Sequence, residues 1–180
     1  PEEFPEDPDE HGFFMQNQFG TPREDAFRRD FTINALFYNI ADFSIIDHVG
    51  GHDDLERRRL RVIGDPKTRF AEDPVRMLRA LEFSARLDFS LDDSTLATIT
   101  GQAPLIAEAA TARIREELLE LFRHGVGAEV LQRAQALELM HPMMGGYAPG
   151  KATFRLLQEL NRYFQKLGKV DEAMILAALF

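Results

Sequence analysis

The spacing of apolar residues along the chain predicts a mainly helical fold. In residues 24–36 the side chains of Phe27, Phe31 and Ala35 recur every four positions, which predicts a helix with a single apolar stripe. The same periodicity predicts further helices over 73–87, 92–101, 111–124, 128–139 and 153–167, and one that starts at Asp171.

Two stretches before residue 50 indicate β-structure. Apolar residues are dense in 13–19, which predicts a short strand or extended segment. Residues 35–40 and 43–49 flank a turn around Ala41 and Asp42, which predicts a hairpin. The predicted fold class is therefore mainly α, a helical body with a small β-hairpin.

Five segments follow one another along the chain. Residues 1–12 form an acidic lead-in, and 13–55 contain the predicted β-structure. A helical region follows over 56–140, and 141–150, rich in proline and glycine, forms a linker. Residues 151–180 begin a further helical region. They end on an apolar run with no stop signal, so we expect a fragment of a longer protein.

Composition narrows the class of protein. The 180 residues carry a formal charge of -9, contain no cysteine and include no apolar run long enough to span a membrane. Disulfides and thiolate zinc sites are excluded, and a reducing, cytoplasmic location is expected. The net acidity argues against a protein that coats nucleic acid with its whole surface. Residues 23–86 nevertheless hold eleven arginines, whose planar guanidinium groups suit phosphates and base edges.

The first candidate site is the segment that contains Arg28, Arg29, Asp30 and Asn34. On a helix, Asp30 and Asn34 project to the same side, where a carboxylate and an amide suit the hydroxyl groups of a sugar. The two arginines beside them suit a polyphosphate. The alternative is a surface helix with an ordinary Arg–Asp ion pair.

The second candidate site lies at the start of the predicted helix 73–87. Pro74 suits a first helical turn, which places Asp73 at the helix start with Arg76 and Arg79 on the same flank. A carboxylate can accept from the exocyclic amine of adenine or cytosine, while a guanidinium donates to the neighbouring ring nitrogen. The pattern therefore favours A and C over G and U. The alternative is an acidic N-cap with local ion pairs.

Three other patterns are interpreted as structural. His48 and His52 have the spacing of zinc ligands on a helix, but the glycines between them argue against a helix. His52 and Asp53 resemble the pair of metal phosphohydrolases, yet no supporting histidine pattern accompanies them. Asp7 and Asp9 form an Asp-x-Asp within the acidic lead-in, where we interpret them as charge alone.

Several motifs together resemble those of the bacterial poly(A) polymerase and tRNA CCA-adding nucleotidyltransferase family (class II). In order along the chain they read RRDFTINALFYNI, DHVGGHDDL, GDPKTRFAEDPVRMLRALEFSARLDF and ARIREELLEL. The resemblance covers roughly 19–124. It implies that 13–55 are the C-terminal part of a nucleotidyltransferase head and that 56–140 are a helical neck with a nucleotide-reading helix.

The resemblance also implies roles for both candidate sites. Residues that bind the phosphate and ribose of the nucleotide would be Arg28, Arg29, Asp30 and Asn34. Residues that recognise the base would be Asp73 and Arg76, with Arg79 as a supporting contact. The segment 47–55 would be a flexible connection between head and neck, and Glu116 or Glu117 would orient an arginine of the base-reading helix. Glu82 departs from the family, in which a basic residue is usual at this position.

The function that the resemblance implies is template-independent addition of AMP to RNA 3′ ends, with ATP as substrate and Mg²⁺ in the full-length enzyme. QFGTPREDAFRRDFTINALFYNI and DHVGG are more similar to the poly(A) polymerase branch than to the CCA-adding branch, which is the nearest alternative. A non-catalytic helical module that binds RNA or protein is an alternative of another class. No membrane partner is expected.

The chemistry of this family uses two carboxylates on a strand to hold two magnesium ions. No such pair precedes Phe13, so no catalytic or metal-binding residue is assigned in this chain. We therefore expect the nucleotide-reading half of a nucleotidyltransferase, which binds ATP weakly, if at all, and adds no nucleotide by itself.

Overall fold

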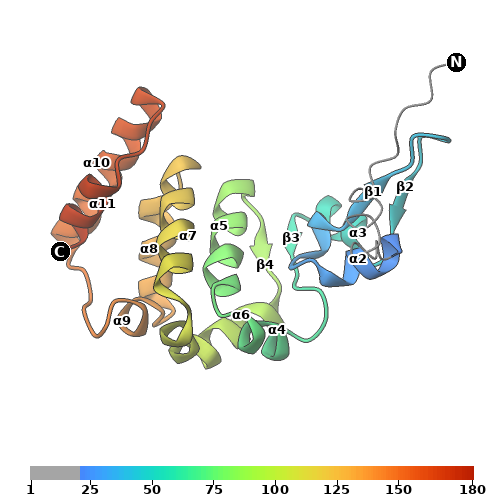
Figure 1. Cartoon of the computed structure of the whole chain (residues 1–180), viewed down its shortest axis with the longest axis horizontal. Helices are drawn as coiled ribbons and strands as arrows, with labels where there is room; N and C mark the ends of the chain where they lie inside the picture. Colours follow the sequence, from blue (N-terminus) through green and yellow to red (C-terminus); the bar gives the residue numbers. More distant parts are fainter. Residues whose placement is uncertain (1–20) are drawn as a thin grey trace, which may run out of the picture.

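The computed structural model describes residues 21–180, which form a row of elements from a β-hairpin at one end to a helical pair at the other (Figure 1). The first part contains α2 (Pro22–Arg28), η1 (Thr32–Asn34), β1 (Leu36–Tyr38), β2 (Ile45–Asp47), α3 (Gly51–Glu56) and β3 (Arg59–Leu60). The middle contains α4 (Pro66–Glu72), α5 (Arg76–Leu87), β4 (Ser90–Leu91), α6 (Asp93–Gln102) and η2 (Ala103–Glu108). The last part contains α7 (Thr111–Arg123), α8 (Gly127–Ala136), α9 (Met140–Met143), α10 (Lys151–Leu167) and α11 (Glu172–Leu179).

The prediction of a mainly helical chain with a small hairpin is confirmed. Strands β1 and β2 pair antiparallel, with Leu36 opposite Asp47 and Tyr38 opposite Ile45. The two residues of β3 pair in parallel with β4. The expected strand over 13–19 and the Asp7–Asp9 pair lie outside the described residues. None of the described helices has the length and apolar character needed to cross a membrane.

One hydrophobic core runs through the helical part. Its largest fully buried side chains include Phe31, Phe70, Phe122 and Phe164, which come from elements spread along the chain. Phe122 on α7 and Phe164 on α10 meet edge to face, with ring centroids 6.1 Å apart. Helix α8 packs against both α5 and α10, so it joins the middle of the molecule to the last helical pair. The helices predicted over 92–101, 111–124, 128–139 and 153–167 correspond to α6, α7, α8 and α10.

The helix predicted over 24–36 is wrong in its second half. Helix α2 ends at Arg28, and Phe31 instead forms an antiparallel bridge with Val62. The N–H of Thr32 donates to the carbonyl of Arg61, and the N–H of Ile63 donates to the carbonyl of Asp30. This pairing with a distant segment satisfies the backbone polar groups that helix continuation would have used. Phe27 is consequently 47% exposed, although Phe31 and Ala35 are buried as expected.

The helix predicted over 73–87 starts three residues later than expected. Helix α5 begins at Arg76, and Asp73 is the C-cap of α4, a helix that was not anticipated. Asp73 has φ -151° and ψ 92°. It takes this extended conformation because the ring of Pro74 disfavours a helical residue before it. Asp73 therefore occupies the corner between two helices.

Candidate functional site

A cleft of about 550 Å³ opens between the end of α2 and the start of α5. Its walls come from segments about forty residues apart, with one further contribution from α7. The lining residues are Arg28, Arg29, Asp30, Asn34, Asp73, Arg76, Arg79, Phe83 and Arg113. All seven residues proposed from the sequence thus line one cavity, although Asp30, Asn34 and Asp73 do not have the helical placement from which they were proposed.

Asp30 connects the two halves of the cleft. Its Oδ2 lies 2.7 Å from Nη2 of Arg79 and accepts a hydrogen bond from Nε of Arg79 at 2.8 Å. Nδ2 of Asn34 donates to Asp30 Oδ1 at 3.3 Å, so the pair predicted on a helix meets across a 3₁₀ turn instead. Burial alone would lower the pKa of Arg79, but the attraction of Asp30 and Glu117 raises it. Arg79 is therefore firmly cationic.

The two neighbouring arginines differ in what they bind. Arg29 pairs with Asp25 at 2.8 Å, donates to the carbonyl of Asn34 at 2.8 Å and lies over the ring of Phe37. Arg28 makes no hydrogen bond or ion pair with its side chain among residues 21–180. Arg28 is therefore the side chain of this pair that is available to a ligand.

Asp73 and Arg76 lie beside each other without forming a pair. Asp73 Oδ2 lies 2.9 Å from Nη1 of Arg113 on α7, and its side chain is 17% exposed. Nη1 of Arg76 donates to the carbonyl of Arg69 at 2.9 Å and lies 3.3 Å from Glu72. Within the described chain, Oδ1 of Asp73 and Nη2 of Arg76 have no such partner. An acceptor and a donor are thus left at the cavity.

Helix α7 braces this wall of the cleft through Glu117. Its Oε2 lies 3.8 Å from Nη1 of Arg79, whereas the neighbouring Glu116 is exposed. Burial raises the pKa of Glu117 to about 7, against the attraction of Arg79.

Glu82, the departure from the family, is 3% exposed, with an oxygen 3.2 Å from Arg86 and 2.9 Å from Nδ1 of His124. It therefore faces the interior and not the cleft.

Three residues that hold the cleft together were missed by the sequence analysis. Arg113 precedes Glu117 by one helical turn, so the spacing on 111–124 was the available signal. Phe83 follows Arg79 by one turn in the same way. Nη2 of Arg69 donates to the carbonyls of Arg28 and Arg29, at 3.0 and 2.8 Å, and no local pattern signals a contact with so distant a segment.

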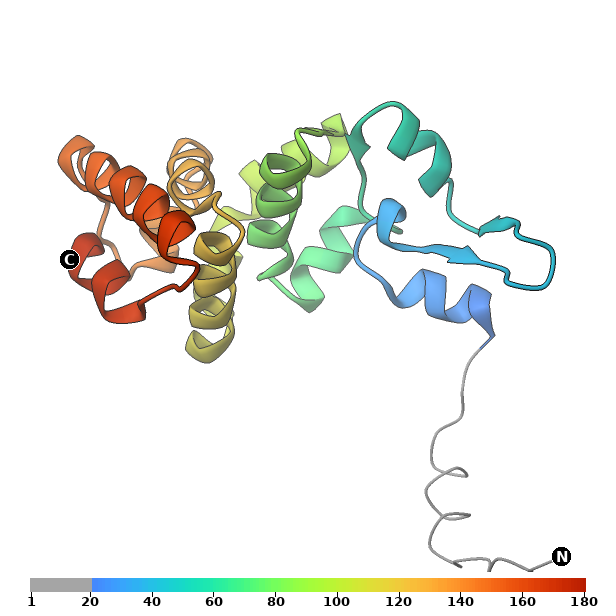
Figure 2. The same cartoon turned by 90° about the horizontal axis from the view of Figure 1, so that it is seen from above.

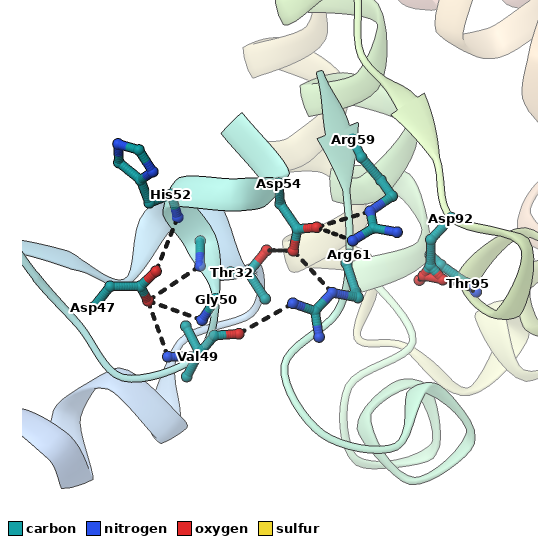
Figure 3. Close-up of polar contacts among 11 residues, drawn as sticks. Thr32, Asp47, Val49, Gly50, His52, Asp54, Arg59, Arg61, Asp92 and Thr95 are labelled. Atoms are coloured by element: carbon teal, nitrogen blue, oxygen red, sulfur yellow. Dashed lines mark hydrogen bonds and ion pairs between the residues drawn. The ribbon is translucent and has the colours of Figure 1, made fainter. Parts of the chain in front are cut away.

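A buried carboxylate fixes the segment behind the cleft (Figure 3). Asp54 is fully buried and accepts hydrogen bonds from Thr32 Oγ1 at 2.7 Å and from Nε of Arg59 and Arg61 at 2.7 and 2.8 Å. Burial would raise the pKa of Asp54, but these donors hold it below the usual value. Asp54 therefore ties α3 and the strand region to the turn that carries Asn34.

Asp47 organises the segment predicted to be flexible. Its carboxylate accepts from the backbone N–H groups of Val49, Gly50, Gly51 and His52, at 2.9 to 3.1 Å (Figure 3). Gly50 has φ +80°, and a Cβ on Gly51 would lie 2.2 Å from the carbonyl oxygen of Thr32. Gly50 thus adopts a left-handed backbone conformation, and Gly51 allows the carbonyl of Thr32 to approach closely. The predicted motion between head and neck stays a prediction.

The carboxylates of the cleft do not suit Mg²⁺. Asp30 is paired with Arg79 and Asp73 with Arg113, and the other charged groups that line the cavity are arginines. Elsewhere, His52, Asp53 and Glu56 have donor atoms within 4.8 Å of one another, all on exposed side chains. Exposed acidic groups commonly lie this close without binding a cation, so no metal site is assigned in the described chain.

The fold and the cavity together define a mainly helical protein with a cleft rich in arginine, which also contains two carboxylates, at the junction of a hairpin region and a helical body. Two family models match the chain. "Poly A polymerase head domain" matches residues 5–61, and "Probable RNA and SrmB-binding site of polymerase A" matches residues 88–151.

Curated proteins and solved structures agree with these matches. The chain is 38% identical over 174 residues to "Poly(A) polymerase I" of Salmonella typhi, a match that covers 91% of this chain and 37% of the relative. It is 46% identical over 98 residues to the "CCA-adding enzyme" of Levilactobacillus brevis, covering 54% of this chain and 24% of the relative. A solved structure of the Bacillus stearothermophilus CCA-adding enzyme in complex with CTP has a TM-score of 0.69 at 30% identity, covering 88% of this chain and 43% of that chain.

The chain belongs to the bacterial poly(A) polymerase and tRNA CCA-adding nucleotidyltransferase family. It spans about two-fifths of the length of the poly(A) polymerase that it matches.

Proposed function

We propose that the chain is the nucleotide-reading part of an RNA nucleotidyltransferase that adds AMP to RNA 3′ ends, with the cleft as the site of the incoming ATP. The observation that carries this proposal is the pair of free polar atoms at the cavity, Oδ1 of Asp73 and Nη2 of Arg76. An acceptor beside a donor complements the exocyclic amine and ring nitrogen of adenine or cytosine.

The other lining residues support a nucleoside triphosphate as ligand. Arg28, unpaired within the described chain, is placed to contact a phosphate. Asp30 and Asn34, which contact each other at 3.3 Å, offer an acceptor and a donor to a ribose hydroxyl. Arg79 is held by Asp30 and Glu117, so its role is to position the wall of the cleft. Arg29, engaged with Asp25 and Asn34, shapes the same wall from the other side.

The length of the matches supports the poly(A) polymerase branch. Similarity to the Salmonella poly(A) polymerase extends over 91% of the chain, whereas similarity to the Levilactobacillus CCA-adding enzyme extends over 54%. CCA addition is the second candidate, because the similar Bacillus structure is a complex with CTP and the free atoms at Asp73 and Arg76 accept either base. Magnesium would be held by residues outside this cleft, whose carboxylates are paired with arginines.

Replacing Asp73 by asparagine tests the base-reading assignment. An amide can donate where the carboxylate only accepts, so D73N should lose its preference for ATP and CTP over GTP and UTP. A well-placed pair of hydrogen bonds discriminates between bases by about 1–3 kcal/mol, so the wild-type preference should be roughly fivefold or more. The measurement is titration of the four nucleoside triphosphates by NMR chemical shift, with the wild-type chain and with D73N.

The matched control is R113Q, which removes the same ion pair with Asp73 but keeps the carboxylate. R113Q should shift the affinities of all four nucleotides together and retain the preference. A wild-type chain that binds the four nucleotides equally, or a D73N variant that keeps the preference, would contradict the proposal. Full-length protein supplied with ATP or CTP and RNA then distinguishes the branches, since incorporation of CTP indicates CCA addition.

A further inference from the structure

A row of basic side chains follows one exposed face of α10. Lys151, Arg155, Arg162 and Lys166 are all exposed and are separated by four, seven and four residues. At about 100° per residue, these spacings place the four side chains within about 60° of one another around the helix axis. With a rise of 1.5 Å per residue the row is about 22 Å long. We call these four residues the α10 basic row.

This charge contrasts with the rest of the chain. Residues 151–169 contain five basic residues and one acidic residue, whereas the remaining residues contain 16 basic and 29 acidic ones. Arg162 pairs with Glu159. Among residues 21–180, Lys151, Arg155 and Lys166 take part in no ion pair. The row therefore offers three uncompensated positive charges on a strongly acidic protein.

An exposed aromatic ring flanks the row. Tyr163 is 48% exposed and precedes Lys166 by three residues, a spacing that makes the two side chains neighbours on a helix surface. Leu156 lies on the same flank, seven residues before Tyr163, and is 49% exposed. A positive track beside an aromatic ring is the arrangement with which proteins bind single-stranded nucleic acid without reading its sequence, because every base can stack on a ring.

The remaining face of α10 is already packed. Phe154, Leu157, Leu160 and Phe164 are buried, and the helix packs against α8 and α11. Outside the narrow exposed flank of Leu156, Tyr163 and Leu167, helix α10 therefore has no free apolar face of the kind with which an amphipathic helix enters a bilayer. Charge complementarity favours a polyanion that stays on the surface of the helix.

We propose that the α10 basic row and Tyr163 bind the phosphate backbone and a stacked base of single-stranded RNA. This inference rests on the proposed function, which supplies RNA as the partner. Except for Lys151, the last matched residue, the contacts that it assigns lie outside the residues 88–151 of the RNA-binding family match. Helix α10 lies at the opposite end of the molecule from the hairpin of β1 and β2, with α5, α7 and α8 between them (Figures 1 and 2).

The test is binding of a fluorescent 15-nucleotide oligo(A) to the chain at a series of KCl concentrations. Each phosphate contact on a single strand contributes about 0.7 to the slope of log K against log salt, so K151Q/R155Q/K166Q should have a slope shallower by about 2. The control R57Q/R58Q/K67Q removes the same number of positive charges from exposed positions that are distant in sequence. Its slope should differ from that of the wild type by less than about half of the 0.7 that one phosphate contact contributes.

A second pair of variants tests the stacking. Y163A should weaken oligo(A) binding by about fivefold or more, since stacking of one base on an aromatic side chain contributes about 1–3 kcal/mol. L156A removes apolar surface from the same flank without removing a ring and should bind oligo(A) like the wild type. A protein or lipid ligand on this flank would instead be weakened by both substitutions.

Three results would overturn the inference: no oligo(A) binding by the wild-type chain at low salt, an unchanged slope for the triple variant, or an equal change of slope in the control. A failure of the proposed base recognition by Asp73 and Arg76 is distinguishable from a failure of RNA binding by the α10 basic row. D73N reports on the choice among nucleotides, and the triple variant reports on the salt dependence of RNA binding.

Discussion

Replacing Glu117 by glutamine should stabilise the folded chain above neutral pH and have little effect in mild acid. The Glu117 side chain is 10% exposed, and its Oε2 lies 3.8 Å from Nη1 of Arg79. Burial raises its pKa from 4.5 to about 7. Arg79 opposes this shift, while the negative charges of Glu82, Glu120 and Asp30 add to it. Folding therefore favours the protonated form of this carboxyl group.

The sign of the pH dependence follows from this raised pKa. As the pH rises above 4.5, the Glu117 carboxyl of the unfolded chain loses its proton first, while that of the folded chain keeps it until about pH 7. The contribution of Glu117 to the free energy of unfolding is therefore fully present below pH 4.5 and lost as the pH rises through 7. At 1.36 kcal/mol per pH unit the total loss is about 3 kcal/mol.

Urea denaturation of the wild type and E117Q at pH 5 and pH 8 measures this loss. The stability advantage of E117Q should grow by about 2–3 kcal/mol between the two pH values, because glutamine does not titrate. E116Q is the matched control, since Glu116 is the exposed neighbour and its replacement should give no such growth. An E117Q advantage that is equal at pH 5 and pH 8 would refute the reasoning.

Two further predictions concern the segment behind the cleft. D54N should destabilise the chain by about 1–3 kcal/mol in urea denaturation, because the amide cannot replace the buried carboxylate as acceptor for Thr32, Arg59 and Arg61 together, whereas D53N, at the exposed neighbour, should change little. G51A should cost about 1–3 kcal/mol because its Cβ would meet the carbonyl of Thr32. G101A, on α6 with open space around it, should instead gain about 0.5–1 kcal/mol. A stable D54N or an equal cost for both glycine variants would contradict these expectations.

Much of the helical framework was predictable from local pattern. The periods of apolar residues in 111–124 and 153–167 identified α7 and α10 within two residues at either end. Asp171 was expected to start the last helix, and its side chain accepts from the N–H of Met174 as an N-cap. These features depend on neighbours within one or two turns of the same helix, so the sequence contains the information directly.

The candidate site was predictable as a set of residues but not as a geometry. Asp30 and Asn34 were expected one turn apart on a helix, and Asp73 at the start of another. The structure brings them to one cleft by a different route, in which Phe31 bridges to Val62 and Asp73 forms a corner between α4 and α5. Their assignment to phosphate, ribose and base stays a prediction.

The sequence by itself determined which side chains have the chemistry that suits a nucleotide and where several of the helices lie, because residue chemistry and helical period are local properties. Only the tertiary structure decided that Arg29 is engaged with Asp25 and Asn34, that Glu82 faces the interior and that Arg113 contacts Asp73. Each of these outcomes depends on contacts between side chains and backbone groups placed by the packing of the fold, and such packing is settled by the burial of the whole core rather than by any single segment.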